Sequence, residues 1–251
     1  MPGEPKRVLI LGGTAEARQL AERAVTGLPT SVEVITSFAG RTNRPRNPPG
    51  MVREGGFGGA HGMADYLKDE AITLVVDATH PFAEAISDHA HDACVMAEVR
   101  RVMLRRPAWR LPPRARWVEV PDMEAAADAV SRFARRAFLT VGRQELAAFA
   151  GVDGVWFLVR MIEAPEDALP LADHEVVLGR PPFDLAAERA LIETHNIDTL
   201  VSKHSGGPLP AKVEAAAEAG LPIVLVQPPP PPPGTEVATA EAALDWIISQ
   251  L

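Results

Sequence analysis

The sequence contains very little cysteine and no long apolar run. Its 251 residues include a single cysteine, Cys94, which excludes an internal disulfide framework and any cysteine-rich metal site. Cys94 lies in a helical pattern, so we expect it to be a buried packing residue. The sequence has no apolar stretch of about 18 residues and no signal peptide, so we expect a cytoplasmic protein without a membrane segment.

Positive charge is also in deficit. The 25 lysines and arginines are outnumbered by 33 acidic residues, which gives a net charge of −8. Such a chain has no general attraction for nucleic acids or anionic membrane surfaces, so we expect neither as a partner. Local arginines and backbone groups must therefore hold any anion that binds.

Two common catalytic patterns are missing. The sequence has no H-E-x-x-H motif and no G-x-S-x-G motif, so we expect neither a catalytic zinc ion nor a serine hydrolase. No metal site is predicted.

Short apolar runs alternate with helical patterns along the whole chain, of which 47% is hydrophobic. This alternation predicts an α/β protein with parallel sheets covered by helices. The strands are expected at 8–11, 32–36, 73–76, 102–104, 117–120, 137–140, 155–159, 199–202 and 223–226. The helices are expected at 15–25, 63–69, 82–97, 122–133, 185–195, 209–219 and 240–251. A loop is expected at 39–59.

A segment rich in proline and arginine, 105–116, interrupts this alternation. We expect a domain boundary there, with one α/β domain over 1–110 and a second over 111–251. Six consecutive prolines, 228–233, predict a stiff polyproline II connection at the surface. A docking site for an SH3-like partner is the alternative for this segment.

The first expected strand runs directly into Gly12-Gly13-Thr14, and a helical pattern begins at once. Such a junction directs backbone N–H groups toward the space above the strand, and glycines allow a ligand to come close. The turn therefore predicts a nucleotide phosphate site. Thr14 stands where the G-x-G-x-x-G fingerprint has its second glycine, so an ordinary strand-to-helix turn remains the alternative.

The loop after the second strand carries no acidic residue that could bind the ribose 2′-hydroxyl of NAD. It carries Arg41 and Thr42 instead, followed by Arg44 and Arg46. A guanidinium group matches phosphate oxygens, so this loop predicts a preference for the 2′-phosphate of NADPH. A solvated basic loop is the alternative.

A third polar segment, Asp77-Ala78-Thr79-His80-Pro81-Phe82, follows another strand. Ligands of open α/β sheets bind at the carboxyl ends of strands, where Thr79 offers a hydroxyl group and His80 a titratable ring. The alternative is a capped helix start with a hydrogen-bonded histidine.

Strand ends in the second half also carry cations. The segment Ser202-Lys203-His204-Ser205-Gly206-Gly207 predicts an anion-binding turn. Arg143, Arg160 and Arg180 follow other strands, and such a set suits a substrate with several carboxylates. Each arginine by itself is more typical of a surface charge than of a ligand.

Together these segments resemble the precorrin-6A reductase (precorrin-6x reductase) family of cobalamin biosynthesis. The resemblance is carried by residues 11–18, 39–42, 77–83, 105–109, 140–146, 159–163 and 203–207. It implies two Rossmann-like domains with an active-site cleft between them. It also implies that NADPH gives a hydride to one carbon of a conjugated tetrapyrrole, precorrin-6A, and that a proton is added at the neighbouring carbon. His204 departs from the family, whose members often carry asparagine there.

The resemblance also assigns roles to individual residues. Cofactor binding is expected from Gly12, Gly13, Thr14, Glu16, Arg18, Arg41, Thr42, Thr79, Ser205, Gly206 and Gly207. Substrate binding is expected from Arg143, Arg160 and Lys203. His80, Lys203 or water would donate the proton.

Several alternatives stay open at this point. The chain could reduce or dehydrate another small metabolite with NADPH, or it could sense the nucleotide without turnover. The substrate could be metal-free or contain cobalt, the protein could be a monomer or a small homo-oligomer, and an edge strand of one half could complete the sheet of the other.

Overall fold

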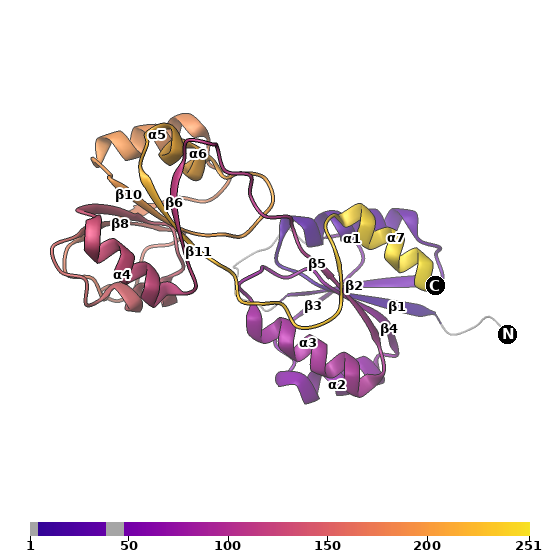
Figure 1. The fold of residues 1–251 in the computed structure, drawn as a ribbon. Coiled ribbons are helices and arrows are strands. Elements are labelled where there is room, and N and C mark those ends of the chain that lie inside the picture. Colours follow the sequence, from indigo (N-terminus) through magenta and orange to yellow (C-terminus); the bar gives the residue numbers. More distant parts are fainter. Residues whose placement is uncertain (1–4, 39–47) are drawn as a thin grey trace. The chain divides into compact units, whose positions relative to one another are not determined.

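The computed structural model describes residues 5–38 and 48–251, and it contains two compact α/β units (Figure 1). Unit 1 is formed by Met1–Pro107 and Pro229–Leu251, and unit 2 by Ala108–Pro228. Each unit has one six-stranded sheet, and all the strand pairs described are parallel. The expected fold class, two parallel sheets flanked by helices, is confirmed. None of the described helices is long and apolar enough to cross a membrane.

The sheet of unit 1 has the strand order β3-β2-β1-β4-β5-β12. Counted along the chain, this is the order of the doubly wound dinucleotide-binding fold. Its strands are β1 (Lys6–Leu11), β2 (Val32–Phe38), β3 (Met51–Glu54), β4 (Ile72–Asp77), β5 (Arg100–Leu104) and β12 (Thr235–Val237). Its helices are α1 (Ala15–Gly27), α2 (Gly59–Asp69), α3 (Glu84–Ala97) and α7 (Ala240–Gln250).

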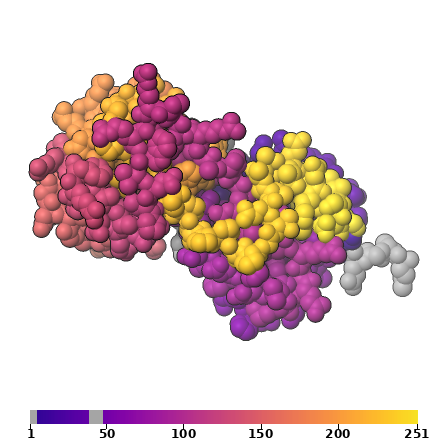
Figure 2. All heavy atoms as spheres, viewed as in Figure 1, coloured from indigo at the N-terminus to yellow at the C-terminus, as the bar shows by residue number. Residues whose placement is uncertain are grey.

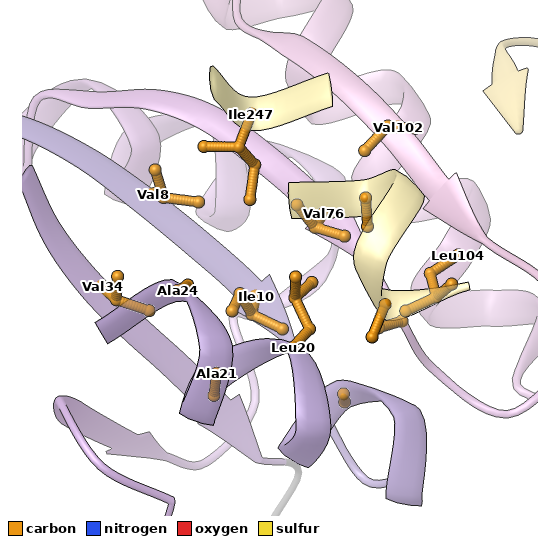
Figure 3. Packing of buried hydrophobic residues seen from close by; sticks show 14 of the residues in the cluster. Val8, Ile10, Leu20, Ala21, Ala24, Val34, Val76, Val102, Leu104 and Ile247 are labelled. Atoms are coloured by element: carbon orange, nitrogen blue, oxygen red, sulfur yellow. The ribbon is translucent and has the colours of Figure 1, made fainter. Parts of the chain in front are cut away.

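Strand β1 is buried on both faces because helices cover both sides of the sheet. Val8 and Ile10 point to one side, where they belong to a core shared with α1 and α7 (Figure 3). Leu9 and Leu11 point to the other side, toward α2 and α3. Cys94 of α3 is buried there, as expected, and this burial raises the pKa of its thiol to about 12. A strand covered on both faces reads as an unbroken apolar run, which is why the sequence located β1 so well.

The sheet of unit 2 has the order β6-β11-β10-β7-β8-β9. The arrangement is the same as in unit 1 except for one edge strand. The strand beside β11 is β6, which comes first in the sequence of its unit, whereas the corresponding strand of unit 1, β12, comes last. Helices α5 and α6 pack together (Figure 1), and α4 packs with η1. The strands are β6 (Arg116–Val120), β7 (Arg136–Leu139), β8 (Trp156–Met161), β9 (His174–Leu178), β10 (Thr199–Lys203) and β11 (Pro222–Val226). The helices are α4 (Met123–Phe133), η1 (Arg143–Phe149, a 3₁₀ helix), α5 (Leu185–Thr194) and α6 (Ala211–Glu218).

The end of the chain returns to unit 1, which differs from the expected division into 1–110 and 111–251. Strand β12 pairs with β5, and α7 packs against α1. Figure 2 shows these last residues, in yellow, on the surface of the first unit. The reason is apolar burial, because Ala243 and Ile247 of α7 complete the core above β1. The proline run 228–233, which has neither helix nor strand, leads from unit 2 into this returning segment.

The expected positions were wrong mainly at sheet edges. Strands β3, β9 and β12 were not expected, and β3 lies inside the expected loop 39–59. Each is short, lies at the edge of its sheet and has no fully buried residue. Helix α3 begins at Glu84 and not at Phe82, because residues after His80 first form a turn.

We predict that Ile247→Ala lowers the free energy of unfolding of unit 1 by about 2–4 kcal/mol, because a buried isoleucine is lost from the core. The neighbouring Ile248 is 52% exposed, so Ile248→Ala should change it by less than about 0.5 kcal/mol. Urea unfolding of both variants checks this. Equal effects would show that α7 does not belong to the core of unit 1.

Candidate functional site

The strand order of unit 1 reverses between β1 and β4, so the loops that follow these strands border a crevice at the carboxyl edge of the sheet. The two loops are the glycine turn after β1 and the segment 78–83 after β4. They are hydrogen-bonded to each other: Ala78 N–H donates to the carbonyl of Leu11 (3.1 Å), and the Thr14 hydroxyl donates to the carbonyl of Ala78 (2.8 Å). The crevice therefore has a fixed floor made by two segments that sequence patterns had identified separately.

The two glycines of the turn have different structural roles. Gly12 donates its N–H to the carbonyl of Ser37 (2.9 Å), and a Cβ there would lie 3.1 Å from the side chains of Thr36 and Phe38. Gly13 has φ +114°, and a Cβ there would have no neighbour within 4 Å. Gly12 thus keeps the turn close to β2, while Gly13 leaves open space beside the start of α1. That space suits a ligand approaching the helix N-terminus.

Thr14 is the N-cap of α1. Its hydroxyl oxygen accepts a hydrogen bond from Ala17 N–H (3.0 Å) while its proton goes to Ala78. The Thr14 side chain therefore joins the helix start to the loop after β4. A phosphate contact by this residue would be made by its backbone.

Glu16 and Arg18, both expected at the cofactor site, lie in different surroundings. Glu16 is in the first turn of α1, where its Oε1 lies 3.6 Å from Nη1 of Arg106. Its Oε2 is buried and has no hydrogen-bond partner among the described residues. Arg18 forms an i,i+4 ion pair with Glu22 (3.2 Å) and is partly exposed. Glu16 thus borders the turn, whereas the charge of Arg18 is partnered along the surface of its helix.

Asp77, at the end of β4, is buried against Arg101 of β5. The Asp77 Oδ2 to Arg101 Nη1 distance is 3.7 Å, and the two side chains are 4% and 5% exposed. Asp77 Oδ1 accepts hydrogen bonds from the hydroxyl (2.7 Å) and the N–H (3.2 Å) of Thr79. Asp77 is therefore occupied in shaping the loop that carries Thr79.

His80 is exposed at this edge. Its Nδ1 accepts a hydrogen bond from Phe82 N–H (3.3 Å), so the proton of the neutral ring is assigned to Nε2. The Thr79 hydroxyl also lies 3.2 Å from that of Ser87. A space of about 10 Å³, the size of one water molecule, lies between Thr79, His80, Ser87 and Arg105. Arg41 and Thr42, expected at the 2′-phosphate, lie outside the described residues.

The strand order of unit 2 reverses between β7 and β10, and the cationic turn predicted from the sequence lies at this point. Lys203, the last residue of β10, forms an ion pair with Glu145 of η1. His204 is buried with its ring against Trp109 (centroids 4.7 Å apart), so this side chain contributes to packing. The turn continues after His204, at the same edge of the sheet, with Ser205, Gly206 and Gly207.

The arginines expected at the substrate are already paired with acids. Arg160 makes a two-pronged ion pair with Glu188 (2.6 and 2.8 Å), which is 1% exposed. Arg143 lies 3.3 Å from Asp167 at the surface. The sequence analysis missed Lys212 of α6, whose ammonium donates to the Thr140 hydroxyl (2.7 Å). Burial lowers the pKa of Lys212 to about 8. A lysine in the first turn of a helix, where the dipole opposes it, was the available signal.

Fold and site together define an α/β protein of the dinucleotide-binding type. Unit 1 has the doubly wound order and a glycine turn at the reversal point, and unit 2 repeats the arrangement with cations at its own reversal point. An orphaned carboxylate oxygen on Glu16 and open space beside Gly13 fit a ligand with hydrogen-bond donors and an anionic group.

Comparisons with known proteins identify the family. The family model "Precorrin-6x reductase CbiJ/CobK" matches residues 7–248. The chain is 44% identical to a precorrin-6A reductase of Rhodococcus erythropolis, covering 96% of this chain and 97% of that protein. It is 29% identical to a cobalt-precorrin-6A reductase of Salmonella typhimurium, covering 94% and 93%. A solved structure, "CobK precorrin-6A reductase", matches with a TM-score of 0.89 and 37% identity over 98% of this chain and 97% of that one. The chain therefore belongs to the precorrin-6x reductase family.

We predict that Thr14→Val lowers the unfolding free energy of unit 1 by about 1–2 kcal/mol, because the helix cap and the bond to Ala78 are both lost. Thr14→Ser keeps both bonds and should stay within about 0.5 kcal/mol. Thr26→Val on the exposed side of the same helix is the matched control. Urea unfolding measures all three, and a Thr14→Val value equal to that of the control would contradict the bridging role.

Proposed function

We propose that this chain is an NADPH-dependent precorrin-6A reductase of cobalamin biosynthesis. The observation that carries the proposal is similarity over both units at once. A precorrin-6A reductase is 44% identical over 96% of the chain, and a solved one matches with a TM-score of 0.89. The similarity therefore extends well beyond the glycine turn of unit 1, which is a feature that many dinucleotide-binding proteins share.

The substrate is proposed to be metal-free. Relatives named precorrin-6A reductase are 38–44% identical to this chain, whereas those named cobalt-precorrin-6A reductase are 26–29% identical at similar coverage. No residue at the described carboxyl edges visibly senses a metal, so this choice depends on the relatives alone.

The residues of unit 1 suit a nicotinamide dinucleotide. Its diphosphate would lie beside Gly13 and the first turn of α1, where the backbone N–H groups and the helix dipole favour an anion. The free carboxylate oxygen of Glu16 would accept a hydrogen bond from a ligand N–H or O–H. Arg41 and Thr42 would bind the 2′-phosphate, as their sequence position suggests.

When bound, NADPH supplies the hydride, which is two electrons and one hydrogen nucleus. The reaction would add the hydride to one carbon of a double bond in the macrocycle and a proton to the neighbouring carbon, with the oxidised cofactor as the second product. The protein mainly orients the two reactants. We propose His80 as the proton donor, because its exposed ring lies on the same sheet edge as the glycine turn and Nε2 can carry the proton. Lys203 would bind a substrate carboxylate.

The proposal predicts that purified protein oxidises NADPH when precorrin-6A is added, and that absorbance at the NADPH band falls with formation of precorrin-6B. His80→Asn should lower kcat by about 100-fold, with the KM for NADPH unchanged, because loss of a general acid slows only the chemical step. The matched control is His61→Asn, because His61 is an exposed residue of α2.

Binding of NADPH without oxidation would instead favour a nucleotide sensor. No binding of either reactant would leave the reductase proposal without support. An unchanged kcat in His80→Asn would remove His80 as the donor and point to water or Lys203.

We further predict that Arg41→Ala raises the KM for NADPH by about tenfold or more, while that for NADH changes by less than about twofold, because only NADPH carries the 2′-phosphate. Steady-state kinetics with both cofactors measure this. An equal effect on the two would contradict a 2′-phosphate contact by Arg41.

A further inference from the structure

A carboxylate stands at the anion-binding end of α1. Glu16 lies in the first turn of this helix, and the N–H groups of Gly13, Thr14, Ala15 and Glu16 donate to no carbonyl group among the described residues. Unused N–H groups at a helix start attract a phosphate. The Glu16 carboxylate is stabilised by the same helix dipole and has the same sign of charge as a phosphate, so it opposes phosphate binding. An anion can bind well at this turn only where the charge of Glu16 is offset.

Arg106 is placed to offset that charge. Its Nη1 lies 3.6 Å from Oε1 of Glu16, and the two side chains are 19% and 21% exposed. No other cationic group in the part of the chain that the structure describes lies within 4 Å of the Glu16 carboxylate, because the nearby Arg18 is paired with Glu22. Solvent and salt screen a partly buried pair less than an exposed one, so Arg106 cancels much of the charge of Glu16.

The sheet holds Arg106 across the crevice from Glu16. Strand β4 lies between β1 and β5, Glu16 belongs to the helix after β1, and Arg106 follows β5 (Figure 1). The ion pair therefore spans the carboxyl end of β4. The preceding residue, Arg105, donates its N–H to the carbonyl of Val237 in β12 (2.9 Å). This bond fixes the backbone just before Arg106, so the arginine is positioned by the edge of the sheet.

The pair cancels charge without using all the acceptor capacity of Glu16. A separation of 3.6 Å is an ion pair but too long for a hydrogen bond. The other oxygen, Oε2, is buried and has no hydrogen-bond partner among the described residues. The two-pronged pair of Arg160 with Glu188 is different, because it occupies both carboxylate oxygens. Glu16 is thus close to neutral in its net effect and still able to accept a hydrogen bond from a ligand.

We propose that Arg106 is a positioning residue of the dinucleotide site and that it acts through Glu16. Its charge offsets the carboxylate, so that a diphosphate can bind the N–H groups at the start of α1 while Oε2 of Glu16 accepts a hydrogen bond from the same ligand. The identity of the ligand as NADPH is taken from the proposed function, on which this role rests. Because the role is electrostatic, removal of the carboxylate should make the arginine dispensable.

The test uses the full-length chain and fluorescence titration with NADPH. Arg106→Met should weaken NADPH binding by about tenfold or more, because the carboxylate then repels the diphosphate. The double variant Glu16→Gln with Arg106→Met should bind within about threefold of the wild type, because a neutral amide does not repel a phosphate and its oxygen can still accept a hydrogen bond. Arg106→Lys keeps the charge and should also stay within about threefold. Arg23→Met removes an exposed arginine of the same helix and is the matched control.

Steady-state kinetics separate this role from a role in the chemical step. Arg106→Met should raise the KM for NADPH by about tenfold or more and change kcat by less than about threefold, since only binding is affected. Glu16→Gln alone should bind NADPH at least as tightly as the wild type, because the charge of Arg106 then acts on the diphosphate. This single variant keeps the test decisive if Arg106→Met does not fold, which its thermal transition shows.

Calorimetric titration with inorganic diphosphate distinguishes this role from the proposed function. Diphosphate binding that follows the same order among the variants, without oxidation of NADPH, would keep the role of Arg106 and overturn the reductase proposal. Oxidation of NADPH with an unchanged KM in Arg106→Met would keep the reductase and overturn the role of Arg106. Weak binding in the double variant as well would show that Arg106 does not act through Glu16. A tenfold loss of affinity in Glu16→Gln alone would equally contradict the proposal.

Discussion

The buried ion pair between Asp77 and Arg101 is the interaction on which the crevice of unit 1 depends. Neither charge can remain buried without the other, because an unpaired charge in a protein interior costs about 3–5 kcal/mol. Asp77 fixes the turn that carries Thr79, and Arg101 donates to the carbonyl of Pro233 (2.8 Å). One pair therefore holds the loop at the crevice and the segment that returns from unit 2. The loop at the ligand edge and the returning segment are thus linked by one buried charge pair, in addition to the apolar burial of α7.

Paired charges also explain how an acidic chain can accept anionic ligands. At the carboxyl edge of unit 1, Glu16 lies near Arg106. At that of unit 2, Lys203 is matched by Glu145 and Arg160 by Glu188. Such pairs orient side chains without creating a strong field, so these residues add little net charge to the carboxyl edge of either sheet.

The sequence predicted the buried part of the fold because burial leaves a pattern. Strands β1, β4 and β10 are largely buried and read as apolar runs, whereas β3, β9 and β12 are short edge strands without a fully buried residue. The return of α7 to unit 1 could not be predicted either, because an amphipathic helix does not specify which core it covers. The proline run 228–233 predicted a connecting segment, but it did not predict that the chain beyond it returns to unit 1.

The candidate site was predictable to the same extent. The sequence placed Gly13 and Thr79 at strand ends, and parallel topology then brought their loops together. It could not reveal that the Thr14 hydroxyl donates to the carbonyl of Ala78, since that bond depends on the neighbouring loop. Which side chains pair with each other depends on the tertiary structure, so these partners could not be predicted from residue types.

Arg160 and Lys212 show why pairing decides function. Arginine at a strand end is the expected ligand for a carboxylate, and Arg160 has the right geometry for it. Glu188 already occupies that geometry, at 2.6 and 2.8 Å, and its own burial makes the pair expensive to open. A ligand carboxylate would have to displace Glu188 to reach Arg160, leaving that acid buried and unpaired. Lys212 requires no displacement, because a hydroxyl is its hydrogen-bond partner. The two cations therefore differ in what a carboxylate would have to break: an ion pair at Arg160, but at Lys212 only a hydrogen bond to a hydroxyl.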